Sequence, residues 1–248
     1  GKIYVFGGFA IGQGLNNIVY EFDPLADTWS EKAILTENVL NAGAATIGDK
    51  IYVVGGDTVY SSPERLREFT PTTGDWRPLS DLPTPRGHAA VIAWQGKLHV
   101  IGGANDYWPI FEAHSAYEVY SPQSDTWESR QGLNEQRYYA YAAVANNKLF
   151  VLGGISAQYQ DIPYIDYYDE SLDYWLPKSS LPTTQQYGVA QSVSEKIHII
   201  GGHMRTEPYD YLATHTQFIS GGWFLEATGT VNDAGPVDLT VSGVVANI

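Results

Sequence analysis

A group of side chains suited to holding a ligand stands at related positions in the chain. Arg86 and Arg137 each lie 11 residues before a lysine that opens an apolar run. A guanidinium group binds a carboxylate through two parallel hydrogen bonds, and aromatic rings stack on sugars or on peptide side chains. These residue types predict a site for an acidic sugar or an acidic peptide. The ligand-binding candidates are Arg86, Arg137, Tyr138, Asn105, Tyr107, Trp108 and His203.

Catalytic and metal chemistry have less support in the sequence. The six histidines form no closely spaced group with carboxylates, and His99 and His198 occupy equivalent positions within apolar runs. The chain has no cysteine, which excludes a disulfide, a thiolate metal site and a cysteine nucleophile. We therefore expect no catalytic residue, no metal site and no cofactor.

A recurring segment positions the candidates. Residues 50–56 read Lys-Ile-Tyr-Val-Val-Gly-Gly, and successive copies start 48, 47, 51 and 48 residues apart. A fixed period near 50 residues indicates stacked supersecondary units, so the repeat predicts one domain over residues 1–248. The copies begin at Lys2, Lys50, Lys97, Lys148 and Lys196.

Each repeat predicts four short strands and almost no helix. A small-residue strand (A) precedes the lysine-led strand (B), a variable loop leads to a strand ending in an aromatic (C), and a tryptophan strand (D) follows. The fifth repeat departs from this order, and we expect its C and D strands at 214–220 and 223–227. The aromatic–tryptophan pairs are Phe22 and Trp29, Phe69 and Trp76, Tyr120 and Trp127, and Tyr168 and Trp175.

Alternating strand directions place the variable loops together. The B–C and D–A loops fall on one face of the repeats, and the short A–B and C–D turns fall on the other. Variation in length and residue type is concentrated in the first set of loops. Loops displayed on a rigid scaffold commonly carry binding sites, so we expect the ligand on that face.

The repeat resembles the kelch repeat, in which a hydrophobic run ending in Gly-Gly is followed by a spaced aromatic and a tryptophan. The resemblance covers residues 1 to about 200, and its motif recurs four times in register. It implies an all-β fold, a β-propeller with one four-stranded blade per repeat. It also implies that the glycine pairs serve packing. Kelch repeats often have arginine where Arg86 and Arg137 stand, so inter-blade pairing is a second interpretation of both residues.

The C-terminal segment of the sequence predicts how the propeller closes. Residues 239–247 read as an A strand, and position 1 begins at a B strand. We therefore expect a five-bladed propeller whose first blade is completed by the C-terminal strand, because pairing removes an exposed edge. Part of a six- or seven-bladed propeller is the alternative.

Similar folds leave several functions open. Galactose oxidase uses a cysteine-crosslinked tyrosine, which the absence of cysteine excludes here. Plant specifier proteins hold iron through a spaced acidic and histidine motif that has no match. Sialic-acid epimerases also use a kelch ring, so an enzyme acting on an acidic sugar remains the alternative to a binding module. A structural assembly domain of a larger protein is the third hypothesis.

Composition restricts the classes of partner that the chain can bind. The chain has 14 basic and 28 acidic residues, giving a net charge of −14. This charge repels nucleic acids and anionic membranes, and no apolar run approaches the ~20 residues of a membrane span. We expect a soluble protein, cytoplasmic or disulfide-free secreted. Our preferred function is a module that binds a protein segment or carbohydrate on the loop face.

Overall fold

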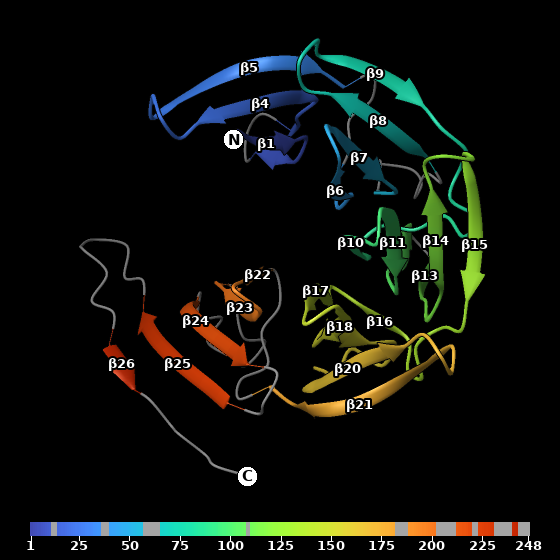
Figure 1. Cartoon of the computed structure of the whole chain (residues 1–248), viewed down its shortest axis with the longest axis vertical. Helices are drawn as coiled ribbons and strands as arrows, with labels where there is room; N and C mark the ends of the chain where they lie inside the picture. Colours follow the sequence, from blue (N-terminus) through green and yellow to red (C-terminus); the bar gives the residue numbers. More distant parts are fainter. Residues whose placement is uncertain are drawn as a thin grey trace.

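The computed structural model consists of β-sheets arranged radially about an axis (Figure 1). It describes residues 1–10, 14–35, 40–56, 65–107, 110–181, 188–201, 212–219, 223–230 and 240–242. These residues form no helix, and so no helix that could traverse a bilayer. The all-β fold and the repeat-by-repeat sheets predicted from the sequence are confirmed.

Each repeat forms one antiparallel sheet, which we call a blade and number from the N-terminus. Blade 1 has three strands, blades 2 to 4 have four, and blade 5 has five. The strands are, in blade 1, β1 (Ile3–Phe6), β4 (Ile18–Asp23) and β5 (Thr28–Ile34); in blade 2, β6 (Gly43–Ile47), β7 (Lys50–Val54), β8 (Leu66–Thr70) and β9 (Asp75–Pro78); in blade 3, β10 (Ala90–Trp94), β11 (Lys97–Ile101), β14 (Tyr117–Ser121) and β15 (Thr126–Arg130); in blade 4, β17 (Tyr141–Ala145), β18 (Lys148–Leu152), β20 (Tyr164–Asp169) and β21 (Tyr174–Ser180); and in blade 5, β22 (Val189–Val193), β23 (Lys196–Ile200), β24 (Leu212–Ile219), β25 (Trp223–Thr230) and β26 (Thr240–Ser242).

In blades 2 to 5 the small-residue A strands lie innermost and the D strands lie outside them (Figure 1). The A–B connections are the tight turns that the sequence predicts. Gly48, Gln95 and Asn146 all have positive φ, at 63°, 51° and 48°. Such φ values suit glycine and asparagine best, which explains the composition of these turns.

The Gly-Gly pairs allow neighbouring blades to approach closely. A Cβ on Gly55 would lie 2.2 Å from the Arg86 carbonyl oxygen, and one on Gly102 would lie 2.4 Å from that of Arg137. Gly55 and Gly102 also have φ of +62° and +61°. Because both the space and the dihedral exclude a side chain, the glycine pairs serve packing, as the resemblance implied.

The repeated tryptophans join one blade to the preceding one. Trp127 Nε1 donates to the Ser80 carbonyl at 2.8 Å, and Trp175 Nε1 donates to the Gln131 carbonyl at 3.1 Å. Trp175 is fully buried and meets the Tyr117 ring edge-on, with centroids 5.4 Å apart. These contacts make the D strands of blades 3 and 4 part of inter-blade cores.

The C-terminal strand does not close blade 1 as predicted. Within the tail, the structure describes β26, and this strand pairs with β25 at the outer edge of blade 5. Strand β1 is an edge strand that pairs only with β4 among the described strands. The prediction failed because a short β-rich segment satisfies its hydrogen bonds on any free sheet edge, here the nearest one in sequence. The predicted C and D strands of the fifth repeat match β24 and β25 closely.

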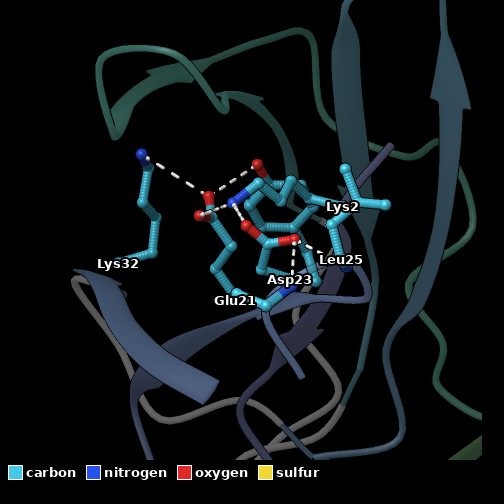
Figure 2. Close-up of polar contacts among 7 residues, drawn as sticks. Lys2, Glu21, Asp23, Leu25 and Lys32 are labelled. Carbon is cyan, nitrogen blue, oxygen red and sulfur yellow. Dashed lines mark hydrogen bonds and ion pairs between the residues drawn. The ribbon is translucent and has the colours of Figure 1, made fainter. Parts of the chain in front are cut away.

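Charged side chains connect the three strands of blade 1. Figure 2 shows Lys2 and Lys32 reaching the Glu21 carboxylate, at 3.3 Å and 3.5 Å. Lys2 also lies 2.7 Å from Asp23, and the Tyr4 hydroxyl donates to Glu21 at 2.8 Å. The hydrogen bond from Tyr4 is the main cause that lowers the pKa of Glu21. These groups are paired within the blade.

Candidate functional site

The B–C and D–A loops meet on one face, as predicted. Strand β16 (Arg137–Tyr138), in a D–A loop, pairs with β19 (Ile155–Ser156), in a B–C loop. Gly87 and Ala104 exchange two backbone hydrogen bonds of 2.9 Å in the same way one blade earlier. The B–C loop of blade 3 forms its own hairpin from β12 (Ala104–Tyr107) and β13 (Ile110–Ala113). We call this surface the loop face.

Arg86 lies inside blade 3 and not at the surface. Its side chain is 1% exposed, and its Nη1 lies 2.5 Å from Glu118 Oε2. Its Nε donates to the Gly102 carbonyl at 2.6 Å, and its own carbonyl accepts from Gly56 of blade 2. Burial lowers the pKa of Arg86, and the Glu118 charge opposes that change. Arg86 therefore joins two blades.

Arg137 repeats this arrangement one blade later. It is 2% exposed, and its Nη2 donates to Asp166 at 2.6 Å within blade 4. Its carbonyl accepts from Gly103 of blade 3 at 2.8 Å. The geometry favours the inter-blade interpretation of both arginines, because a guanidinium paired with a buried internal carboxylate has little to offer a ligand.

Three residues with left-handed backbone surround the axis on the loop face. Asn41, His88 and Tyr139 have φ of 58°, 55° and 54°. The His88 amide donates to the Asn41 carbonyl, and the Tyr139 amide donates to the His88 carbonyl, both at 3.0 Å. Non-glycine residues seldom adopt this conformation, and it concentrates at functional sites. These two backbone hydrogen bonds therefore connect three residues around one opening, which we call the mouth.

A pocket of about 260 Å³ occupies the mouth. Deeper along the axis, the A strands of blades 2 to 5 line a second cavity of about 480 Å³. The Tyr141 hydroxyl accepts a hydrogen bond from the Gly188 amide at 2.9 Å in the mouth. Small and aliphatic residues line the deeper cavity together with Thr46, Gln191 and Ser192, whereas the mouth carries the rings of His88, Tyr139 and Tyr141. The mouth pocket is lined by Asn41, Ala42, His88, Ala89, Tyr139, Ala140, Tyr141 and Gly188.

A ladder of aromatic rings leads from the mouth outward. Tyr139 meets His88 edge-on at 4.3 Å and lies 5.1 Å from Tyr138, measured between ring centroids. Phe111 of β13 meets Tyr138 at 4.9 Å and stacks on Tyr159 at 5.3 Å. Tyr159, at the outer end, is 50% exposed. The ladder thus offers a stacking surface supported by buried rings.

Backbone hydrogen bonds close the loop that carries Tyr159. The Ser156 amide donates to the Gln160 carbonyl at 2.8 Å, and the Tyr159 amide donates to the Ser156 carbonyl at 2.9 Å. Tyr159 itself has φ of 60°. An exposed ring on a tightly bonded loop loses little entropy when a ligand stacks on it.

The remaining sequence-predicted residues have mixed positions. Tyr138 is buried in the ladder, and Asn105 is half-buried on β12 opposite Glu112. Tyr107 ends β12, and Trp108 and His203 lie outside the described residues.

Phe111 has no role predicted from the sequence, because no repeat position marks it. A register signal does mark the mouth, since Asn41, His88 and Tyr139 each stand nine residues before a repeat lysine. Within the described ranges, no three metal-ligating side chains lie together.

Comparison with known proteins identifies the repeat. The Kelch motif family matches residues 1–36 and 39–83. Human Kelch-like protein 23 is 25% identical over 75% of this chain, and Kelch-like protein 25 of Xenopus tropicalis is 23% identical over 83%. The family match and these relatives support the kelch-repeat resemblance that the sequence carries.

The relatives are longer proteins. This chain spans 32% of Kelch-like protein 23 and 24% of Beta-scruin from Limulus polyphemus, which is 24% identical over 82% of the chain. A solved structure titled Structure of YjhT shares the fold, with a TM-score of 0.73, covering 97% of this chain and 90% of that one. Its sequence identity is 15%, so the likeness supports the kelch fold alone.

Proposed function

We propose that this chain is an interaction module that binds a protein segment on the loop face, over the aromatic ladder and the mouth. The observation that carries the proposal is the continuous set of rings from His88 to Tyr159, which ends in a half-exposed tyrosine on a fixed loop. Hot spots in interfaces are enriched in aromatic residues that are supported by buried neighbours.

The charge of the surface points to the chemistry of that segment. Glu112 follows Phe111 directly, and Asp161 stands two residues after Tyr159, in a chain of net charge −14. The buried arginines are engaged by Glu118 and Asp166, so they do not favour a carboxylate ligand. A segment carrying arginine, lysine or proline fits better, because cations and proline rings both stack on tyrosine.

The rival enzyme hypothesis loses its main support for the same reason. An enzyme acting on an acidic sugar needs a cation that is free to bind the sugar carboxylate, and Arg86 and Arg137 were its candidates. Both guanidinium groups face carboxylates of their own blade. Protein binding is the function that the described residues support better.

A peptide array probed with the purified chain tests the proposal. Peptides that bind should be rich in basic and proline residues, and their affinity should depend on the ladder. Tyr159→Ala should weaken the best peptide by about 10-fold or more, the equivalent of about 1.4 kcal/mol, without changing the melting temperature.

Tyr174→Ala is the matched control. Tyr174 is also exposed, but it begins β21 beside a C–D turn, away from the loop face. Its loss should leave peptide affinity unchanged. Equal effects of the two substitutions, or a set of acidic peptides as the best binders, would contradict the proposal.

A further inference from the structure

A cavity of about 370 Å³ lies at β8 and β9, the two outer strands of blade 2 (Figure 1). Its buried lining includes Leu66 and Leu79, whereas Arg65 and Asp81 are exposed. None of the described residues that line this cavity also lines the mouth. A cavity of this size, with apolar walls and a few polar groups, is typical of a site for a small ligand group.

Arg67 brings a buried positive charge to the cavity. It is 6% exposed and lies on β8 opposite the fourth residue of β7. Glu118 and Asp166 lie at the same register in blades 3 and 4, opposite the fourth residues of β11 and β18. Those two carboxylates engage Arg86 and Arg137. Blade 2 therefore has a cation where the next two blades have the carboxylate of a buried ion pair.

The charges around the cavity favour an anion. Two arginines and one aspartate line it, so its formal charge is 2 − 1 = +1 in a chain of net charge −14. Burial lowers the pKa of Arg67, the Arg65 charge lowers it further, and the Asp81 charge raises it. An added negative charge would stabilise the buried guanidinium, because an opposite charge nearby favours the ionised form.

Trp76 adds a hydrogen-bond donor to the same lining. It pairs with Phe69 across the strands, and Phe69 stands two residues after Arg67, so the three side chains share one face of blade 2. The equivalent indoles of Trp127 and Trp175 donate to carbonyls of the preceding blade. Among the described residues, the buried Nε1 of Trp76 has no acceptor. A buried donor without an acceptor costs free energy that a ligand oxygen would recover.

We propose that this cavity binds a carboxylate carried by an apolar group. Arg67 holds the carboxylate through charge-assisted hydrogen bonds, and Trp76 Nε1 donates to one of its oxygens. A guanidinium has five N–H donors, so it binds a ligand in addition to its contacts with the chain. Leu66 and Leu79 pack against the apolar part. The C-terminal residue of a protein segment and a free aryl or alkyl acid share this chemistry.

The indole N–H signals of the nitrogen-labelled chain, followed by heteronuclear NMR, measure binding. Phenylacetate is the probe, and phenylacetamide is its uncharged control. We expect phenylacetate to shift the Trp76 signal saturably, with an affinity at least about 10-fold above that of the amide. The signals of Trp127 and Trp175 should stay in place, because both indoles are bonded to carbonyls. The Trp76→Phe variant identifies the signal.

Further ligands separate the sources of the carboxylate. An N-acetylated peptide that ends in phenylalanine is compared with the same peptide ending in an amide. Tighter binding of the peptide acid than of phenylacetate identifies a protein C-terminus, whereas binding of phenylacetate alone identifies a free small acid. Inorganic phosphate should bind at least about 10-fold more weakly than phenylacetate, because a formal charge of +1 suits a monoanion.

Substitutions test the assigned residues. Arg67→Met should weaken phenylacetate binding by about 10-fold or more. Because Arg67 is buried, two exposed positions provide tests that leave the core intact: Arg65→Met should weaken binding and Asp81→Asn should strengthen it, each by about 2- to 5-fold. Arg77→Met is the matched control, since Arg77 pairs with Glu68 on the other face of the blade and its loss should leave the affinity unchanged.

Four results would overturn the proposal. They are a Trp76 signal that does not respond to phenylacetate, equal responses to the acid and the amide, weaker binding in Asp81→Asn, and tighter binding of phosphate than of phenylacetate. An Arg67→Met variant that melts like the parent and binds phenylacetate equally well would remove Arg67 from the site and overturn it too.

Discussion

Replacing Arg86 with methionine tests whether the arginine joins blades or binds a ligand. The substitution removes the contact with Glu118 and the hydrogen bonds to the Gly102, Val100 and Thr84 carbonyls. Glu118 is buried and would be left without its cationic partner. Removal of one member of a buried ion pair costs about 3–5 kcal/mol. In a chain of this size that loss lowers the melting temperature by about 6–20 °C.

Two further variants separate the causes. Adding Glu118→Gln to Arg86→Met should recover part of the loss, because a neutral amide is easier to bury than an unpaired carboxylate. Arg130→Met removes the surface pair with Glu128 and should change the free energy of unfolding by less than about 1 kcal/mol. The assay is thermal and urea unfolding followed by circular dichroism at pH 7.

The affinity of array peptides for the folded Arg86→Met variant completes the experiment. We expect it to match that of the parent below the melting transition, since the guanidinium is not on the loop face. A melting temperature within about 2 °C of the parent, together with a large loss of peptide affinity, would refute the inter-blade role.

Other predictions follow from comparison between repeats. Gly102→Ala should lower the free energy of unfolding in urea by at least about 2 kcal/mol more than Gly48→Ala does. The two glycines have similar φ, but only at Gly102 would a Cβ meet backbone, 2.4 Å from the Arg137 carbonyl oxygen. Equal losses of unfolding free energy would contradict this reason. Burial lowers the pKa of His99 to about 4, so its neutral form stabilises the fold above pH 6.5, and about 3 kcal/mol of this stability is lost as the pH falls to 4. His99→Phe should therefore flatten the dependence of unfolding free energy on pH in that window, and an unchanged slope would show that the histidine does not titrate there. Trp175→Ala should cost about 3–5 kcal/mol and Trp29→Ala about 1 kcal/mol in thermal unfolding, because one ring is buried and the other exposed; similar losses would show that Trp29 is covered.

The repeat made the sheets predictable. Lysine-led runs, glycine pairs and spaced tryptophans fix strand order within a blade, and the short A–B turns expected between strands are present, with positive φ at Gly48 and Asn146. The location of the variable loops on one face also followed from strand alternation. These features depend on local pattern and on a period that recurs along the chain, which a single sequence contains.

Long-range partners could not be predicted in the same way. The carboxylates that engage the two arginines lie 32 and 29 residues further along, and nothing in the local pattern marks Glu118 or Asp166 as their partners. Phe111 reaches Tyr138 because it lies on the β12–β13 hairpin of blade 3. Among the described B–C loops of blades 2 to 4, this is the one that forms a hairpin. The pairing of β26 with β25 was missed because a strand pattern specifies pairing, not the partner.

The most direct test of protein binding on the loop face is a hydrogen-exchange footprint of the best array peptide on the chain. The proposal predicts slower exchange in residues 86–89, 137–140 and 155–161, which surround the mouth and carry Tyr159. The C–D turns at 71–74, 122–125 and 170–173 should exchange as in the free chain, because they lie on the opposite face. Protection of those turns with no change around the mouth would contradict the account.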